Sequence, residues 1–379
     1  MIKLSTLLLA LTVCTAGAET LTAGPAGAPM SFQQALERAA DGDTIELLPG
    51  TYKGQVGVVT QRRLTIRGVG ARPVFDADGT HAEGKAIWVV RDGDVTIDNV
   101  EFRGARVPDG NGAALRFEKG RLLLQRCRLV DNQNGLLTGN DGAAELVIRD
   151  SEFARAPEVV GSLPHLLYAG RIGRLEITGS RFHQGFEGHL IKSRARSTRI
   201  AYNLIVDGAG GGASYEIDLA NGGDAVVVGN IVAQSRQTQN PVVIAYGAEG
   251  RVWDRNRLLL SHNTLVSDFP LAWFLRAWPD KLGAGTTIRA VNNLTVGAGL
   301  FALGASGDFD GNRWTWSSSL EGPGALAFEL ARDSRLRGSA DDPRTLAGDE
   351  SLPTAEFSLP IGTRPLAPPA AWSPGALQR

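Results

Sequence analysis

Short hydrophobic runs recur along most of the chain, separated by breaks that contain glycine, asparagine or aspartate. Within this pattern one motif repeats. It begins with three residues that are mostly Val, Ile or Leu, followed by two residues of any type. The next position is usually Ser, Cys or Asn, and after one further residue the motif ends with an apolar residue. It occurs at Val95–Phe102, Leu122–Leu129, Leu146–Phe153, Leu175–Phe182, Thr198–Ile205, Ala225–Val232, Leu258–Leu265 and Ile288–Thr295. The mean interval is about 28 residues, a period typical of stacked repeat architectures.

A repeat of this length accommodates three short strands and three turns, which is one coil of a parallel β-solenoid. Leucine-rich repeats have a similar period but need a helical half-repeat, which is absent from this pattern, and a propeller blade is longer and antiparallel. The nearly continuous Val, Ile and Leu runs are typical of parallel strands. The pattern therefore predicts an all-β parallel solenoid.

The polar position of the repeat is an asparagine in four consecutive coils, at Asn203, Asn230, Asn263 and Asn293. A side-chain amide both donates and accepts hydrogen bonds, so stacked asparagines can bond to the coils on either side. We predict that these four residues form an internal ladder with a structural role.

The two ends of the predicted solenoid, which spans residues 19–302, need covers because exposed strand edges promote association. The pattern predicts a helix over residues 31–41, with Ser31 and Gln34 forming a capping box, and this helix would cover the first coil. Residues 303–379 are rich in proline and less periodic, and we expect them to form the last irregular coils and a C-terminal cap or tail.

Residues 1–18 have the pattern of a cleavable secretory signal: Lys3, an apolar run over Leu7–Val13, and small residues at 16–18. We therefore expect a periplasmic or secreted protein without a membrane span. Removing this segment takes away Cys14 and leaves Cys127 as a lone cysteine, so no internal disulfide is expected.

The 39 basic and 40 acidic residues nearly cancel, and this balance argues against nucleic acid as a partner. The 47 glycines are consistent with a chain that turns often. We expect a monomer.

A second strand of each coil can be aligned by taking Leu137, Leu167, Ile191, Ile217, Ile244 and Leu275 as inward-facing centres. Because side chains alternate along a strand, the residue after each centre faces outward. The resulting outward row contains Thr138, Tyr168, Lys192, Asp218, Ala245 and Arg276, with Glu216 near Asp218 and Arg194 beyond Lys192.

Such a row suits chemistry on an acidic polysaccharide. Elimination at a uronate needs a base for the proton beside the carboxylate, positive charge on that carboxylate and an acid for the leaving oxygen. The candidates for catalysis are Lys192, Arg194, Tyr168, His189 and Tyr215, and those for substrate binding are Arg196, Arg276 and His165. Calcium is the one cofactor considered, with Glu216 and Asp218 as its oxygen ligands.

Two segments resemble known families. Ser31–Gln55 (SFQQALERAADGDTIELLPGTYKGQ) with Leu64–Gly70 (LTIRGVG) resembles the start of the secreted right-handed β-helix superfamily of pectate lyases, which implies that fold. Glu187–Asn203 (EGHLIKSRARSTRIAYN) resembles the lysine-bearing coil of the alginate lyase and chondroitinase B family. On that resemblance Lys192 is the catalytic lysine, although the family has an arginine where this chain has Asp218.

The favoured function is therefore a polysaccharide lyase that cleaves a uronate-containing polymer by β-elimination. Two alternatives stay open: a glycoside hydrolase that uses Glu216 and Asp218, and a non-catalytic glycan-binding or envelope-structural β-helix. In the second, Lys192 and Asp218 would form a surface ion pair and His165 and His189 a structural stack.

Overall fold

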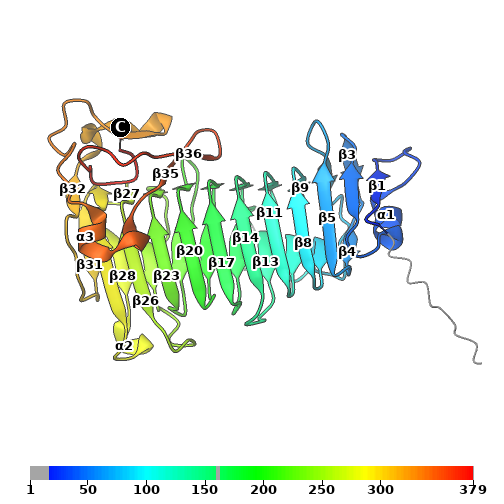
Figure 1. Cartoon of the computed structure of the whole chain (residues 1–379), viewed down its shortest axis with the longest axis horizontal. Helices are drawn as coiled ribbons and strands as arrows, with labels where there is room; N and C mark the ends of the chain where they lie inside the picture. The colour runs from blue at the N-terminus through cyan, green and yellow to red at the C-terminus, as the bar shows by residue number, and fades with distance from the viewer. Residues whose placement is uncertain (1–16, 159–162, 379) are drawn as a thin grey trace, which may run out of the picture.

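The structure is a computed structural model that describes residues 17–158 and 163–378. Three long parallel sheets run side by side along one axis, as an all-β right-handed parallel β-helix (Figure 1). The fold class predicted from the repeat is confirmed. Residues 1–16 of the predicted signal segment lie outside the described part of the chain, and no helix within that part is long and apolar enough to cross a membrane.

Each coil contributes one strand to each sheet, in the order A, B, C. Sheet A contains β1 (Thr20–Ala23), β2 (Thr44–Leu47), β5 (Arg63–Gly68), β8 (Asp94–Asp98), β11 (Arg121–Gln125), β14 (Glu145–Arg149), β17 (Arg174–Thr178), β20 (Ser197–Ala201), β23 (Asp224–Val228), β26 (Arg257–Ser261) and β29 (Thr287–Val291). Sheet B contains β3 (Thr51–Lys53), β6 (Val74–Asp76), β9 (Glu101–Arg103), β12 (Arg128–Val130), β15 (Glu152–Ala154), β18 (Arg181–His183), β21 (Leu204–Val206), β24 (Ile231–Gln234), β27 (Thr264–Ser267), β30 (Leu294–Val296) and β32 (Arg313–Thr315). Sheet C contains β4 (Gly57–Val59), β7 (Ala86–Val90), β10 (Ala113–Phe117), β13 (Asn134–Thr138), β16 (Leu167–Ala169), β19 (Ile191–Ser193), β22 (Ile217–Leu219), β25 (Val242–Tyr246), β28 (Ala272–Ala277) and β31 (Gly299–Leu303).

The turn between sheets A and B has a similar backbone geometry in nearly every coil. This geometry explains the position of the repeated motif that is usually Ser, Cys or Asn. The residue before that position adopts a positive φ. It is glycine at Gly179 (+64°) and Gly229 (+66°), and in the other coils it is Asn99, Arg126, Asp150, Tyr202, His262 or Asn292. This left-handed residue turns the chain through the corner, and the next residue then points into the interior of the coil.

The four asparagines lie in one fully buried stack at this turn. Each side-chain nitrogen donates to the side-chain oxygen of the next asparagine, at 2.9 Å from Asn203 to Asn230, 3.0 Å from Asn230 to Asn263 and 2.9 Å from Asn263 to Asn293. The stack continues to Asn312, 2.9 Å from Asn293, a residue that the repeat did not indicate because its coil is only 19 residues long.

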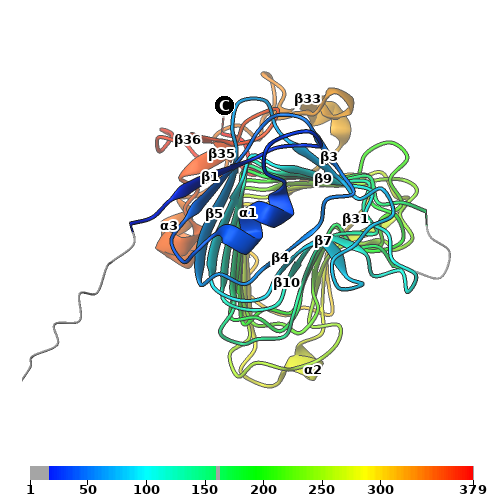
Figure 2. The same cartoon turned by 90° about the vertical axis from the view of Figure 1, so that its right-hand side faces the viewer.

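Helix α1 (Phe32–Arg38) lies across the open end of the first coil (Figure 2). Ser31 and Gln34 form the expected capping box, and the ring of Phe32 stacks on Trp88 with centroids 4.4 Å apart. The helix ends three residues earlier than the predicted position 41. The reason is local, because the Asp43 carboxylate accepts hydrogen bonds from the backbone of Ala40 and Glu19 and holds this stretch out of helical geometry.

The C-terminal segment folds back along the solenoid instead of only extending it. It contains α3 (Pro343–Ala347) and two antiparallel pairs, β33 (Leu320–Gly322) with β34 (Ala327–Leu330) and β35 (Ala355–Phe357) with β36 (Thr363–Pro365). Phe328, Leu330 and Phe357 pack on apolar side chains of sheet B in the last coils. The segment therefore covers sheets A and B and leaves the outer face of sheet C open (Figure 2).

We expect Asn230→Ala to lower the free energy of unfolding by about 3 kcal/mol, because it leaves the buried backbone N–H of Asn203 without its acceptor and removes one hydrogen bond each from the side chains of Asn203 and Asn263. Chemical denaturation measures this change. Asn111→Ala is the matched control, since the Asn111 side chain is exposed, and it should leave stability within about 0.5 kcal/mol of the wild type.

His262 should make the protein sensitive to acid. Burial lowers the pKa of His262 to about 3, and its ring lies 5.2 Å from that of Trp372 in the C-terminal segment. The unfolded chain therefore binds a proton near pH 6.5 that the folded chain does not, so stability is lost as the pH falls below 6.5. Between pH 7 and pH 4.5 the wild type should lose about 2.5 kcal/mol more than His262→Gln, measured by denaturation.

The exposed His81 supplies the control for this measurement. His81→Gln should follow the wild type over the same pH range. An equal loss in His262→Gln and the wild type would contradict the assignment of the acid sensitivity to His262.

Candidate functional site

An open groove with a volume of about 750 Å³ runs along the outer face of sheet C. Figure 2 shows the loops that follow sheet B on one side of this face and the loops that follow sheet C, including the loop that contains α2 (Pro279–Leu282), on the other. Of these, the loops that follow sheet B line the groove, through residues such as Asp109, Asn111 and Leu163. The groove is lined by charged and aromatic side chains from successive coils: Lys85, Arg116, His165, Tyr168, Lys192 and Arg194.

The strand register defines one outward row along this face. It passes through Arg116, Leu137, Tyr168, Lys192, Asp218, Ala245 and Arg276. The structure thus brings together the predicted neighbours Tyr168, Lys192 and Asp218. The predicted register was wrong by one residue in a single coil: Leu136, not Leu137, pairs with the inward Leu167, and Thr138 is buried. The cause is the large sequence separation between β15, which ends at Ala154, and β16, which begins at Leu167, because a fixed period does not allow for it.

Lys192 lies at the centre of an ion-pair cluster. Its Nζ atom is 3.2 Å from Oδ2 of Asp218 and 2.7 Å from Oε1 of Glu249. The other oxygen of Glu249 is 2.5 Å from Nη2 of Arg194, so a single carboxylate bridges both cations. Lys192 is 8% exposed and Asp218 is 2% exposed, so these charges interact in a largely water-excluded environment.

The protonation states follow from burial and from these pairs. Burial disfavours the Lys192 ammonium, but Asp218 and Glu249 outweigh this effect and raise the pKa of Lys192. Burial raises the pKa of Asp218 to about 6, against the lowering effect of Lys192. Burial would also raise the pKa of Glu249, but its bonds to Lys192 and Arg194 lower it. At neutral pH Lys192 is therefore positively charged.

A stack of rings borders the cluster on the side of the sheet B loops. The centroids of His165 and His189 are 4.9 Å apart, as are those of His189 and Tyr215, and Tyr168 stacks on His165 at 5.5 Å. Burial, reinforced by Lys192 and Arg194, lowers the pKa of His165 to about 3, and burial lowers the pKa of His189 well below its usual value. Both imidazoles are neutral at pH 7.

Tyr168 is placed between these rings and the cations. The Lys192 Nζ atom lies 6.0 Å and the Arg194 Cζ atom 5.5 Å from the centroid of the Tyr168 ring. Within residues 17–158 and 163–378 its hydroxyl makes no hydrogen bond. Burial and the charge of Asp218 raise the pKa of the neighbouring Tyr215.

Glu216 does not lie beside Asp218 on the outer face, contrary to the sequence expectation. It precedes β22 (Ile217–Leu219) at the corner, where strand alternation does not apply, and its side chain is fully buried. Its Oε2 atom accepts a hydrogen bond of 3.2 Å from Gln234, and burial, with a further contribution from the charge of Asp207, raises the pKa of Glu216 well above its usual value.

This placement does not fit the calcium site considered from the sequence. The carboxylate of Glu216 contacts Gln234, and that of Asp218 is paired with Lys192. No group of three or more possible ligands from His, Cys, Asp and Glu occurs in the described part of the chain. The two predicted ligands, Glu216 and Asp218, are therefore engaged by different partners and do not face one common site.

The two remaining arginines lie in different surroundings. Arg196 is exposed at the next corner, beside Gly173, and does not line the groove. Arg276 lies in the outward row, with its Cζ atom 5.0 Å from the ring of Trp273 and 4.6 Å from that of Trp278. Among the residues that the structure describes, no carboxylate forms an ion pair with Arg276.

Sequence reasoning missed Glu249 and Arg116. Glu249 lies on an irregular loop after β25, 57 residues from Lys192, and no repeat position marks it. Arg116 occupies the outward row two coils before Tyr168 and would have been found by a correct register at Leu137.

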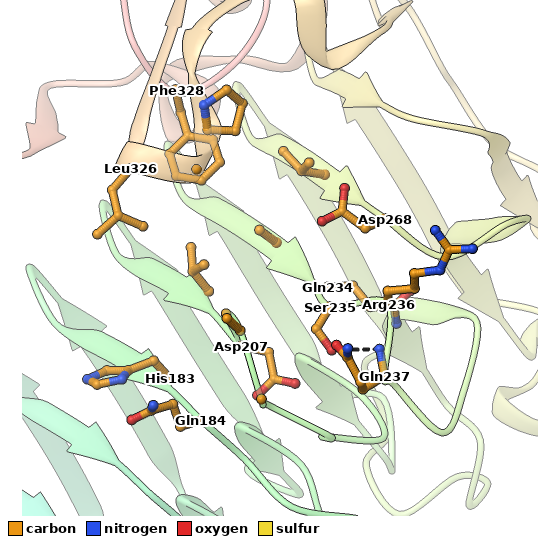
Figure 3. A pocket seen from close by; sticks show the side chains of 18 of the residues that line it. His183, Gln184, Asp207, Gln234, Ser235, Arg236, Gln237, Asp268, Leu326 and Phe328 are labelled. Atoms are coloured by element: carbon orange, nitrogen blue, oxygen red, sulfur yellow. Dashed lines mark hydrogen bonds between the residues drawn. The ribbon is translucent and has the colours of Figure 1, made fainter.

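A second cavity, of about 720 Å³, lies on the outer face of sheet B beneath the C-terminal segment (Figure 3). Leu326 and Phe328 cover it, while His183 and Asp207 line its floor. His183 is bonded to Glu152 at 2.9 Å, and the two oxygens of Asp207 accept backbone hydrogen bonds from Gly185 and Ala213. None of the candidate catalytic residues lines this cavity.

Two solved structures that share this architecture are a pectate lyase and an alginate lyase. A pectate lyase, Pel9A, superimposes with a TM-score of 0.68 over 96% of this chain and 97% of its own, at 15% identity. An alginate lyase from Paenibacillus sp. str. FPU-7 superimposes with a TM-score of 0.54 over 78% of this chain and 99% of its own, at 18% identity. The chain therefore has the lyase-type parallel β-helix fold. No protein-family model matches the sequence, and no curated protein matches it.

We expect Lys192→Met to lower the free energy of unfolding by about 3 kcal/mol at pH 7, because it leaves the buried Asp218 carboxylate without its cation. Combining it with Asp218→Asn should recover most of this loss. Denaturation of both variants measures the change, and equal stabilities of Lys192→Met and the wild type would contradict a buried charge at Asp218.

Proposed function

We propose that the protein is an exported lyase that cleaves a uronate-containing polysaccharide by β-elimination in the groove along sheet C. The observation that carries this proposal is the juxtaposition of two cations, Lys192 and Arg194, with Tyr168 on one open face. The Tyr168 hydroxyl makes no hydrogen bond to any residue that the structure describes. The lyase-type fold supports it, and the signal-like pattern of residues 1–18 supports export.

Elimination at a uronate removes the proton on the carbon beside the carboxylate, forms a carbon–carbon double bond and breaks the bond to the glycosidic oxygen. Lys192 and Arg194 would hold the carboxylate and stabilise the negative charge that develops on it. Because Asp218 and Glu249 keep Lys192 protonated, a charge-stabilising role suits it better than that of a base. Tyr168 would then move the proton from the carbon to the leaving oxygen.

The outward row also suggests how a longer polymer is held. Arg116 and Arg276 each lie three coils from Lys192, about 14 Å away at the spacing of parallel strands. Arg276 is held between two tryptophans, which offer apolar surfaces for sugar rings. Positive groups on both sides of Lys192 suit a substrate that carries carboxylates along its length.

The geometry does not favour a hydrolase that uses Glu216 and Asp218. A glycosidase needs two carboxyl groups on opposite sides of one scissile bond, whereas the carboxylate of Glu216 is fully buried against Gln234.

The test is to incubate the protein with pectate, alginate, glucuronan and glycosaminoglycans and to follow the ultraviolet absorbance of an unsaturated uronate. We expect product from at least one polymer. Binding without unsaturated product from any of them would instead identify a non-catalytic glycan-binding protein.

On the polymer that is cleaved, Tyr168→Phe should reduce kcat by about 10²-fold or more, the usual contribution of a proton-transfer group. The hydroxyl makes no hydrogen bond with a described residue, so the variant should melt at the same temperature as the wild type. Unchanged kcat would remove Tyr168 from the mechanism.

A further inference from the structure

Glu249 is placed where a substrate carboxylate would be expected. Its two oxygens contact the two cations proposed to bind a uronate, Lys192 at 2.7 Å and Arg194 at 2.5 Å. A carboxylate with both oxygens engaged by neighbouring cations is a strong and geometrically specific arrangement. The cluster therefore shows how Lys192 and Arg194 together bind a carboxylate.

We infer that Glu249 is an internal substitute for the uronate carboxylate, and that the substrate binds by displacing it from Lys192 and Arg194. The inference rests on the proposed function in taking these two cations as the uronate-binding pair. It adds that this subsite accepts one carboxylate and that the protein's own carboxylate competes for it.

The exposures of Asp218, Lys192 and Glu249 indicate which of these charged groups a ligand can replace. The side chains of Asp218 and Lys192 are 3% and 10% exposed, whereas that of Glu249 is 36% exposed. Asp218 lies on β22, inside the sheet, whereas Glu249 lies on a loop between Gly247 and Gly250, which both have a positive φ. The Glu249 side chain can turn into solvent without disturbing a strand.

The loop itself does not have to open. The backbone nitrogen of Glu249 donates to Ala220 at 2.8 Å, and the indole of Trp253 donates to the carbonyl oxygen of Arg194 at 3.0 Å. These bonds hold the loop against the coil that carries the cations. Rotation of one side chain therefore exchanges the internal carboxylate for an external one.

The charge balance gives the chemistry of the ligand. Lys192 and Arg194 are balanced by Asp218 and Glu249, so the closed cluster is neutral. With Glu249 turned away the remaining three groups carry one net positive charge in a largely buried setting, and a ligand with one carboxylate restores neutrality. A neutral sugar would not compensate that charge.

The test compares binding of galacturonate and glucuronate, with galactose as the neutral probe, by calorimetry or ligand-observed NMR. Glu249→Gln should bind at least one of the two uronates about tenfold more tightly than the wild type, because the competing charge is gone. Galactose binding should not change. Glu249→Ala should also bind the uronate more tightly than the wild type. Comparison of the two variants shows whether the amide introduced by Glu249→Gln interferes with uronate binding.

Glu176→Gln is the matched control. Glu176 is also bonded to an arginine, Arg174, but it lies on sheet A, away from the groove, so its removal should leave uronate affinity as in the wild type. An increase in this control equal to that in Glu249→Gln would show a general effect of net charge and would overturn the inference.

Unchanged or weaker uronate binding in both Glu249 variants would also overturn it. The outcome is separable from that of the proposed function. Tighter uronate binding without unsaturated product from any polymer would leave the displacement of Glu249 standing and remove the lyase. Unsaturated product without tighter uronate binding would support the lyase and overturn the displacement of Glu249.

Discussion

Stacking of each coil on the next is the constraint on which the rest of this protein depends. Parallel strands satisfy their backbone groups only with the strands above and below, at a spacing of about 4.8 Å, so each coil must turn at the same height as its neighbours. The asparagine ladder meets this condition at the turn between sheets A and B, where each amide joins two coils. The rigid register that results places side chains from distant parts of the sequence in straight rows.

The candidate site uses one of these rows. Lys192 and Asp218 are neighbours because β19 and β22 are paired, and the low exposure of both makes their mutual attraction strong. Glu249 completes the cluster from a loop, which is less constrained than a strand. The division between a fixed pair and a movable carboxylate underlies both the proposed chemistry and the proposed competition with the substrate.

The predicted site and the observed site differ where the regular repeat ends. Tyr168, Lys192 and Asp218 were placed side by side by period and alternation alone, because both rules hold inside strands. Glu216 was wrongly predicted to lie on the outer face because it precedes its strand, where alternation does not hold. Leu137 was wrongly predicted to face inward because β15 and β16 are far apart in the sequence. Arg196 was predicted to bind substrate, yet it is exposed at a corner of the coil and does not line the groove.

The sequence by itself determined the solenoid, its period, the ladder and the face on which charged residues gather, because these depend on local alternation repeated many times. Only the tertiary structure decided which carboxylate neutralises which cation. Glu249 and Lys192 are 57 residues apart, and their contact depends on how an irregular loop lies against the two preceding coils. The tertiary structure also decided that the C-terminal segment covers sheets A and B and not sheet C. The reason is that the outer face of sheet B in the last coils is apolar and gives that segment a surface to bury.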